Sequence, residues 1–424
     1  MNKTIEQAIT NLRLNAERYA RPTRYYNGEH DLKFATEKFQ NTFGTLFREF
    51  ALNLCPVICD AVRDKLRVTG FSLEEADSPH SDTRQIWQRN RMATRAGEIH
   101  KESLICGDAY MIVWPNEHGG AVFYPNKAAN ITIAADEAAP GSIIWAAKVW
   151  RTADKHVRLN LFYPDRIEKY ISKKEVEGSL PDADAFAPLG ESVPNPYGIV
   201  PVFHFANNAD LGTQGRSELE AAIPVQDGLN KSVLDMLVAM EFAAYRQRWA
   251  AGIEIEIDEN GKTVAPFKAG IDHVWISENP QARFGDFEAS QLDQFLKVKD
   301  SFRVDMASVT GTPLHYFLQQ TGGFPSGESL KKAETRFLAK VRDRQQSFGQ
   351  VWADAMAFAL PIEGQGRDIR LITEWEDPAP MAEREFLENI LLKKQIGLPV
   401  EQALLEAGYG EADVKKMVKG SGIE

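Results

Sequence analysis

Two long segments of helical period, separated by a short stretch of strand period, constrain the fold of this chain more than any other feature. The first runs from about Pro224 to Trp249 and the second from about Ser290 to Val309. Each carries an apolar stripe, formed by Val225, Leu229, Val233, Met236, Leu237, Met240 and Ala244 and by Leu292, Phe295, Leu296, Phe302, Val304 and Met306. One pair of helices cannot bury both stripes, so we expect neighbouring copies of the chain to cover them.

The stretch between these helices predicts a small β unit. Three apolar and three acidic residues alternate along it, namely Ile253, Glu254, Ile255, Glu256, Ile257 and Asp258. Asn260-Gly261 supplies a hairpin turn, and Val274-Trp275-Ile276 a further strand. Gly261-Lys262-Thr263 also resembles the end of a phosphate-binding loop, but Glu256 stands where that motif needs glycine. The hairpin interpretation is therefore favoured.

The remaining segments predict an α+β protein. Helical patterns cover residues 2–20, 43–66, 86–105, 328–360 and 381–419. A turn-rich segment, Arg24 to Asp31, ends the first of them. Short β-rich runs separated by Gly, Pro, Asn and Asp fill residues 109–205, and a further strand is expected at 369–372. These runs predict a mainly antiparallel sheet attached to the N-terminal helices.

Composition and charge narrow the class of protein. The chain has 424 residues, 43% of them hydrophobic, which predicts a folded protein of two or more domains. It contains no run of about 18 apolar residues, and residues 1–7 lack the apolar core of a secretion signal, so no membrane partner is expected. The net charge of −11 argues against a protein that grips DNA phosphates, but not against one that lets DNA slide past.

Signatures of catalysis and of metal binding are missing from the sequence. No His-Glu-x-x-His pair occurs, and Phe324-Pro325-Ser326-Gly327 has the wrong glycine spacing for a nucleophile elbow. Cys55 and Cys59 fit half of a metal site, or small buried residues, and the second interpretation is favoured. The acidic pairs Asp227/Asp235 and Glu254/Glu256 are interpreted as solvated surface. We therefore predict no catalytic residue, no cofactor and no metal.

One helix is locally basic. Between Glu328 and Arg344 the cations include Lys331, Lys332, Arg336 and Lys340. A solvated face is the default interpretation of such a run, and a subunit-interface or DNA-facing role is the alternative. The helix follows a glycine-rich loop, residues 314–327, whose length between two helices is typical of a functional loop.

Five sequence blocks, in this order, resemble the siphovirus-type portal proteins of tailed bacteriophages. The resemblance covers nearly the whole chain and rests on Tyr25-Tyr26-Asn27-Gly28-Glu29-His30, Asn53 to Val62 with Gly70-Phe71, Cys106 to Val113, Gly215 to Lys231, and Thr310 to Leu314 with Pro325 to Leu330. Each block alone is weak evidence for the resemblance, whereas the five blocks in this order are specific.

The resemblance implies a portal fold with seven parts. The wing would take residues 1–222, with helices and a mainly antiparallel sheet, and residues 328–380 would give a long helix and its return strand. Stem helices would take 223–250 and 290–309, with the clip at 251–289 between them. The tunnel loop would be 310–327, and 381–424 a short helical crown.

The resemblance also implies a function. Portal proteins of this kind form a dodecameric ring at one capsid vertex, which is the channel for packaging and ejecting double-stranded DNA without sequence specificity. Terminase, a head-tail adaptor, scaffolding protein and the major capsid protein would be partners, in a virion assembled from chains made in the host bacterial cytoplasm. By this resemblance the DNA-facing residues of the tunnel loop would be His315, Gln319, Gln320, Thr321, Gly322 and Gly323.

The clip would dock partners through Glu254, Glu256 and Asp258. Two alternatives to a portal stay open from the residues themselves. One is another structural virion protein, such as an adaptor or minor head protein. The other is a metal-dependent nuclease, which the absence of convergent acids in the sequence disfavours.

Overall fold

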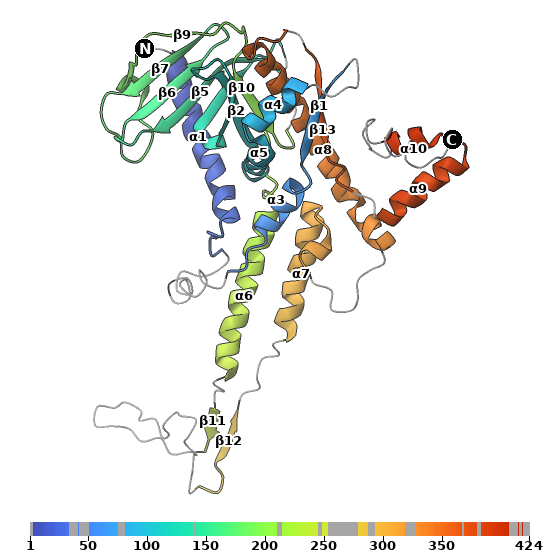
Figure 1. Ribbon diagram of the computed structural model, residues 1–424. Coiled ribbons are helices and arrows are strands. Elements are labelled where there is room, and N and C mark those ends of the chain that lie inside the picture. The colour runs from blue at the N-terminus through green and yellow to red at the C-terminus, as the bar shows by residue number, and fades with distance from the viewer. Residues whose placement is uncertain are drawn as a thin grey trace. The chain divides into compact units, whose positions relative to one another are not determined.

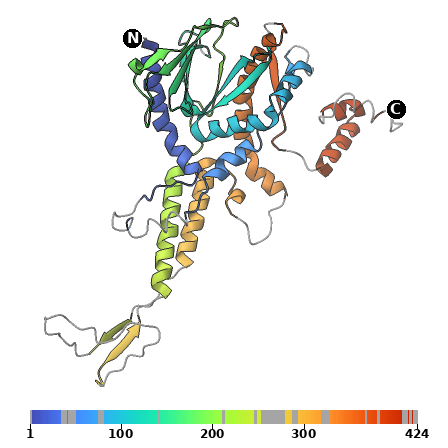
Figure 2. The ribbon, with the colours of Figure 1, turned by 60° about the vertical axis from the view of Figure 1, so that its left-hand side comes forward.

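The computed structural model describes residues 3–33, 41, 51–74, 81–139, 141–209, 214–244, 248–252, 279–286, 293–318, 327–366, 369–379, 383–406, 414 and 418. The chain divides into two compact units, residues 1–374 and 375–424. Figures 1 and 2 show the elements of each unit in two views. The described helices include none long and apolar enough to cross a bilayer.

Helix α1 (Lys3–Tyr26) extends six residues beyond the predicted end, because it continues through Pro22. Tertiary contacts hold these last turns: Tyr19 and Tyr25 are buried, and the Tyr25 hydroxyl donates to Asp227 at 2.5 Å. Such contacts offset the cost of a proline inside a helix. The chain turns only at Asn27-Gly28, where Gly28 has a φ of 85°.

Three further helices follow. Of the helix predicted over 43–66, the described residues form α3 (Cys55–Arg63). The helix predicted over 86–105 is instead two helices, α4 (Ser81–Arg89) and α5 (Met92–Cys106), because Arg91 adopts a left-handed φ of 53°. The Asn90 side chain fixes this break, since it donates to the carbonyls of Ile86 and Ala121, each at 3.0 Å.

The β-rich region forms two antiparallel sheets, which confirms the predicted strand orientation. A three-stranded sheet has the order β10 (Val202–Ala206), β2 (Asp108–Pro115), β3 (Ala121–Asn126). A six-stranded sheet consists of β4 (Ile131–Ala135), β5 (Ile143–Arg151), β6 (Val157–Phe162), β7 (Arg166–Ser172), β8 (Phe186–Pro188) and β9 (Val193–Pro194). Short 3-10 turns, η1 (Ala128–Asn130) and η2 (Ala183–Ala185), connect strands.

The six-stranded sheet buries one face against α1. Alternate positions along its strands point toward the helix, as the two-residue period of a strand requires. The shared core consists of Ile5, Ala8, Ile9 and Leu12 from the helix, with Trp145, Ala147, Val149, Val157, Leu159, Leu161 and Phe186 from the sheet. Helix α1 therefore covers one face of this sheet with its apolar side.

The three-stranded sheet packs against α5 and α8 (Gly327–Ile362). Fully buried Trp352 on α8 donates its indole N–H to Nε2 of His100 on α5 at 2.9 Å. Phe205 of β10 packs against the Trp352 ring with centroids 4.8 Å apart. Burial lowers the pKa of His100 to about 3, so this histidine is neutral at pH 7. We call the two sheets with α1, α5 and α8 the sheet domain.

The long helices predicted from the apolar stripes are α6 (Ala222–Ala244) and α7 (Asp293–Thr310). The prediction that the first helix reaches Trp249 was wrong, because Arg248–Ala251 form strand β11, which pairs with β12 (Arg283–Asp286). The indole of Trp249 lies where a Cβ on Gly285 would stand, so this cross-strand contact favours the strand. The predicted strands between residues 253 and 276 lie outside the described residues.

Two elements close the first unit. The segment after α7 forms a 3-10 turn, η3 (Leu314–Tyr316), before α8. The strand expected at 369–372 is β13 (Leu371–Trp375), two residues later, and it pairs with β1 (Val68–Leu73).

The second unit contains α9 (Glu383–Gln395) and α10 (Val400–Glu406). The single helical segment predicted over 381–419 is therefore interrupted. Gly397, with a φ of 96°, and Pro399 separate the two helices, since neither residue favours a continuous helix.

Candidate functional site

Helices α6 and α7 lie side by side and form what we call the helical pair (Figures 1 and 2). The two helices pack tightly at Gly228, where a Cβ would lie 2.8 Å from Cε1 of Phe302. Glycine at this position lets the aromatic ring pack directly on the backbone of α6. The apolar stripes thus meet in part, as the sequence indicated.

Much of the α7 stripe, however, faces solvent. In α7, all of whose residues are described, Met306 and Thr310 are the buried ones. Leu296 is 48% exposed, Val298 43%, and Val304 and Val309 47% each. At 3.6 residues per turn, Leu296 and Val298 point about 160° apart around the helix, so exposed apolar side chains lie on two of its flanks.

The first part of the predicted tunnel loop (310–327) is anchored on α8. Gly311 turns the chain with a φ of 65°, and the Lys340 ammonium donates to the carbonyl of Thr310 at 3.1 Å. Nε2 of His315 lies 3.3 Å from Oε1 of Glu334 on α8. Tyr316 packs against buried Phe337 with ring centroids 5.7 Å apart. The described part of this loop, up to Leu318, therefore packs on the surface of α8.

Glu218, which precedes α6, is the centre of a buried ion cluster. Its carboxylate pairs with Lys340 and, at 2.9 Å, with Arg344, both on α8, and the Glu218 side chain is 8% exposed. Burial alone would raise the pKa of Glu218, but the charges of Lys340 and Arg344 outweigh burial and lower it. Because Lys340 also holds Thr310, this cluster ties the start of α6, the end of α7 and α8 together.

The predicted site residues therefore fall into three groups. Lys340 is mostly buried and pairs with Glu218, a pairing that its charge alone could not distinguish from the solvation of a surface lysine. Lys332 and Arg336 are exposed on α8, and His315 is half-buried beside Glu334 of the same helix. Lys331 lies on α8, but its side chain is not described. The other predicted site residues lie outside the described residues, namely Gln319, Gln320, Thr321, Gly322, Gly323, Glu254, Glu256 and Asp258.

The described residues contain no group of three His, Cys, Asp or Glu side chains that could hold a metal ion. Cys55, Cys59 and Cys106 are free and buried, as the composition indicated for the first two. Burial raises the pKa of the Cys55 and Cys106 thiols to about 12, so both are protonated and unreactive at neutral pH.

Comparison with known proteins identifies the family. The profile of the family described as phage portal protein, SPP1 Gp6-like, matches residues 5–419. The chain belongs to this portal protein family. The portal protein of Mycobacterium phage L5 is 25% identical over 389 residues, covering 84% of this chain and 76% of that protein. The portal protein of Mycobacterium phage D29 is 24% identical over 378 residues, with the same coverage.

A solved structure shares the fold. A chain of the native gene transfer agent virion is 11% identical, with a TM-score of 0.50 over 89% of this chain and 95% of that chain. Membership of the portal family confirms the resemblance drawn from the five blocks, and with it a structural role in a phage particle.

Two of the blocks that carried the portal resemblance meet in the structure. A Cβ on Gly215 would lie 1.9 Å from the carbonyl oxygen of Gly107, so only glycine allows these backbones to touch. The fully buried Asp108 carboxylate accepts hydrogen bonds from Gly215 N–H at 2.8 Å and from Tyr19 and His204 at 2.7 Å each. Burial opposes its charge, but these bonds outweigh burial and lower the pKa of Asp108.

The interpretation of Asp227 as solvated surface was wrong. Its side chain is 3% exposed, accepts from the Tyr25 hydroxyl, and lies 3.7 Å from Arg21. The neighbouring Gln226 accepts from Leu54 N–H at 2.9 Å and donates to Leu52 O at 2.5 Å. The signal for these contacts was the polar run Gln226-Asp227 inside an apolar stripe, since buried polar residues in such a run need partners.

Proposed function

We propose that this portal-family chain assembles into a closed ring, of twelve subunits in the virion, around a channel for double-stranded DNA. In this arrangement α6 and α7 form the stem, residues between them the clip, and the sheet domain the wing. The segment after α7 is the tunnel loop, and the second unit is the crown. Terminase and the head-tail adaptor dock on the clip, and scaffolding and capsid proteins contact the wing at the portal vertex.

The exposed apolar side chains of α7 carry the proposal. A subunit of a cyclic ring contacts one neighbour on each side through different surfaces, so it needs apolar contacts on two flanks. Leu296 and Val298 supply such contacts, because they are exposed and lie on opposite flanks of α7. Burying each of these side chains against a neighbouring copy contributes roughly 1 kcal/mol to assembly. This contribution recurs at every interface of the ring.

The acidic balance of the chain fits passage of DNA rather than its retention. Strong binding to phosphates would need many unpaired cations, each releasing counterions. Here Lys340 and Arg344 pair with Glu218, Arg344 pairs with Asp343 as well, and the predicted loop residues Gln319 to Gly323 are uncharged. Weak, easily exchanged hydrogen bonds to the duplex suit a channel wall, and no catalytic step by this chain is needed.

Light scattering after size-exclusion chromatography tests the assembly. The wild-type chain should elute as a ring at micromolar concentration, and Leu296→Gln or Val298→Gln should each shift it toward monomer. Ile144→Gln is the matched control, since Ile144 is 50% exposed on the sheet domain. A wild-type monomer under all salt conditions, or assembly by both α7 variants as complete as that of the control, would refute the ring.

A further inference from the structure

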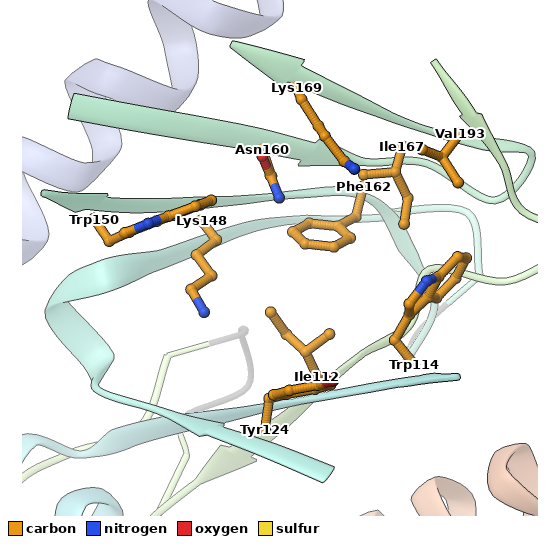
Figure 3. A pocket seen from close by; sticks show the side chains of 10 residues that line it. All are labelled: Ile112, Trp114, Tyr124, Lys148, Trp150, Asn160, Phe162, Ile167, Lys169 and Val193. Atoms are coloured by element: carbon orange, nitrogen blue, oxygen red, sulfur yellow. The ribbon is translucent and has the colours of Figure 1, made fainter. Parts of the chain in front are cut away.

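A cavity of about 250 Å³ lies between the two sheets, away from the helical pair. Figure 3 shows the side chains that line it. They come from β2, β3, β5, β6, β7 and β9, and are Ile112, Trp114, Tyr124, Lys148, Trp150, Asn160, Phe162, Ile167, Lys169 and Val193. The portal function described above makes no use of this cavity.

One wall of the cavity carries a polar row. Lys148 pairs with Asn160 in the β5–β6 register, and Asn160 pairs with Lys169 in the β6–β7 register. The three side chains therefore stand in line across adjacent strands, on the same face of the sheet. Strand spacing puts the Cα atoms of the two lysines about 10 Å apart.

The two ammonium groups have no anionic partner among the described residues. None of the ten lining residues is acidic. The Lys148 ammonium lies 5.4 Å from the centre of the Trp150 ring, a cation–π contact that leaves its positive charge uncompensated. Burial lowers the pKa of Lys148, so an incoming anion would relieve an existing electrostatic cost.

The opposite wall is apolar and aromatic. Ile112 and Tyr124 are register partners on β2 and β3, so both face the cavity from one side of their sheet. Tyr124 is 41% exposed, and Trp114 is half-buried beside them. Such a surface binds an apolar side chain, and aromatic pockets of this kind are frequent anchors of protein interfaces.

We propose that this cavity binds a protein segment in which one apolar side chain stands between two carboxylates. In an extended segment, residues i and i+2 point to one side about 7 Å apart, within reach of both lysine side chains, and residue i+1 points to the other side. The carboxylates then meet Lys148 and Lys169, and the apolar side chain meets Ile112, Trp114 and Tyr124.

The charges and the apolar walls of the cavity favour a peptide over a nucleic acid as the ligand. The walls offer two cations in a row across adjacent strands and aromatic surface from Trp114 and Tyr124, whereas a nucleic acid strand presents a phosphate at every nucleotide. The net charge of −11 also repels a polyanion, but leaves a short segment with two carboxylates free to approach this local pair of lysines.

Fluorescence polarisation of the full-length chain tests the site. The probe is a fluorescein-labelled, amidated peptide of sequence Ser-Glu-Phe-Glu-Ser, and its twin carries Gln in place of both Glu. The wild-type chain should bind the probe at least 10-fold more tightly than the twin. Lys148→Gln with Lys169→Gln should lose at least 10-fold in affinity, and Tyr124→Ala several-fold.

The matched control is Lys173→Gln with Lys174→Gln, which removes the same charge from exposed positions in the same domain and should bind like wild type. Equal binding of probe and twin, equal binding by all variants, or no binding at millimolar peptide would overturn the proposal. So would tighter, lysine-dependent binding of a short oligothymidylate, which would make this a nucleic-acid site. Loss of ring assembly in the Lys148/Lys169 variant would instead assign the cavity to a second copy of the chain.

Discussion

The sheet domain and the helical pair of this portal-family chain are built in opposite ways. In the sheet domain, large side chains such as Trp352, Phe205 and Phe123 are fully buried, and the buried Asp108 has a donor for each carboxylate oxygen. In α7, most apolar side chains stay partly exposed. The first region buries its own core, whereas in the proposed ring the second is completed by other copies, so we expect substitutions in the two regions to fail differently.

The largest expected effect comes from the contact of Gly215 with Gly107. Gly215→Ala places a Cβ 1.9 Å from a carbonyl oxygen. Because the neighbouring atoms belong to the backbone, they can move away only at a high cost in free energy. We expect a loss of about 4 kcal/mol or more in the free energy of unfolding, measured by urea denaturation. Gly97→Ala is the control, because a Cβ on that helical glycine meets nothing within 4 Å and should stabilise slightly. Equal stability of the two variants would show that the sheet domain is loosely packed.

The second effect concerns the ion cluster that joins the sheet domain to the helical pair. Glu218→Gln removes the buried carboxylate that pairs with Lys340 and Arg344, and we expect a loss of about 3 kcal/mol in the free energy of unfolding. Glu177→Gln removes an exposed ion pair with Lys155 and should change stability by less than about 0.5 kcal/mol. If both variants matched wild type by calorimetry, the cluster would be incidental to folding.

The same cluster predicts a pH dependence. The folded pKa of Glu218 is lowered, so its contribution is complete above the unfolded pKa and is lost as pH falls through the folded value. The unfolded pKa of a glutamate is about 4.3. The difference in free energy of unfolding between wild type and Glu218→Gln should therefore be constant from pH 7 to 5 and narrow below about pH 4. Chemical denaturation across this range measures the gap, and a gap that widens on acidification would contradict the assignment.

A smaller effect is expected inside the helical pair. Gly228→Ala brings a Cβ to 2.8 Å from the Phe302 ring, but that ring can shift, so we expect a loss of about 1–2 kcal/mol. Adding Phe302→Leu should restore part of the loss, because the two residues contact each other. A double variant that is merely the sum of both singles would mean that α6 and α7 do not pack at this point.

The sequence predicted the regular parts of this fold from their periodicity. The two stripes located α6 and α7, and strand alternation over 109–205 gave antiparallel sheets. Errors occurred where tertiary contacts override local preference. Helix α1 passes through Pro22 because Tyr25 is anchored on Asp227, and the α4–α5 break depends on Asn90 bonds to β3.

The sequence located the segments that form the candidate site, but it did not show which of their charged side chains are paired. A lysine or acid on an amphipathic helix has the same sequence signature whether it is solvated or paired, so Lys340 and Asp227 were assigned to the surface. Their partners, Glu218 and Tyr25, are distant in sequence and become visible only when α8 and α1 are placed. Likewise, the cavity residues Lys148 and Lys169 are brought into line by strand register, which no local pattern specifies.

Hydrogen exchange in the assembled and dissociated chain tests the central contrast most directly. Amides of β5, β6 and β7 should be equally protected in ring and monomer, because the sheet domain buries its own core. Amides of α7 from 295 to 309 should exchange at least 10-fold faster in the monomer, where Leu296, Val298, Val304 and Val309 stay uncovered. Equal protection of α7 in both states would show that the helical pair needs no neighbour, and would contradict its completion by other copies in a ring.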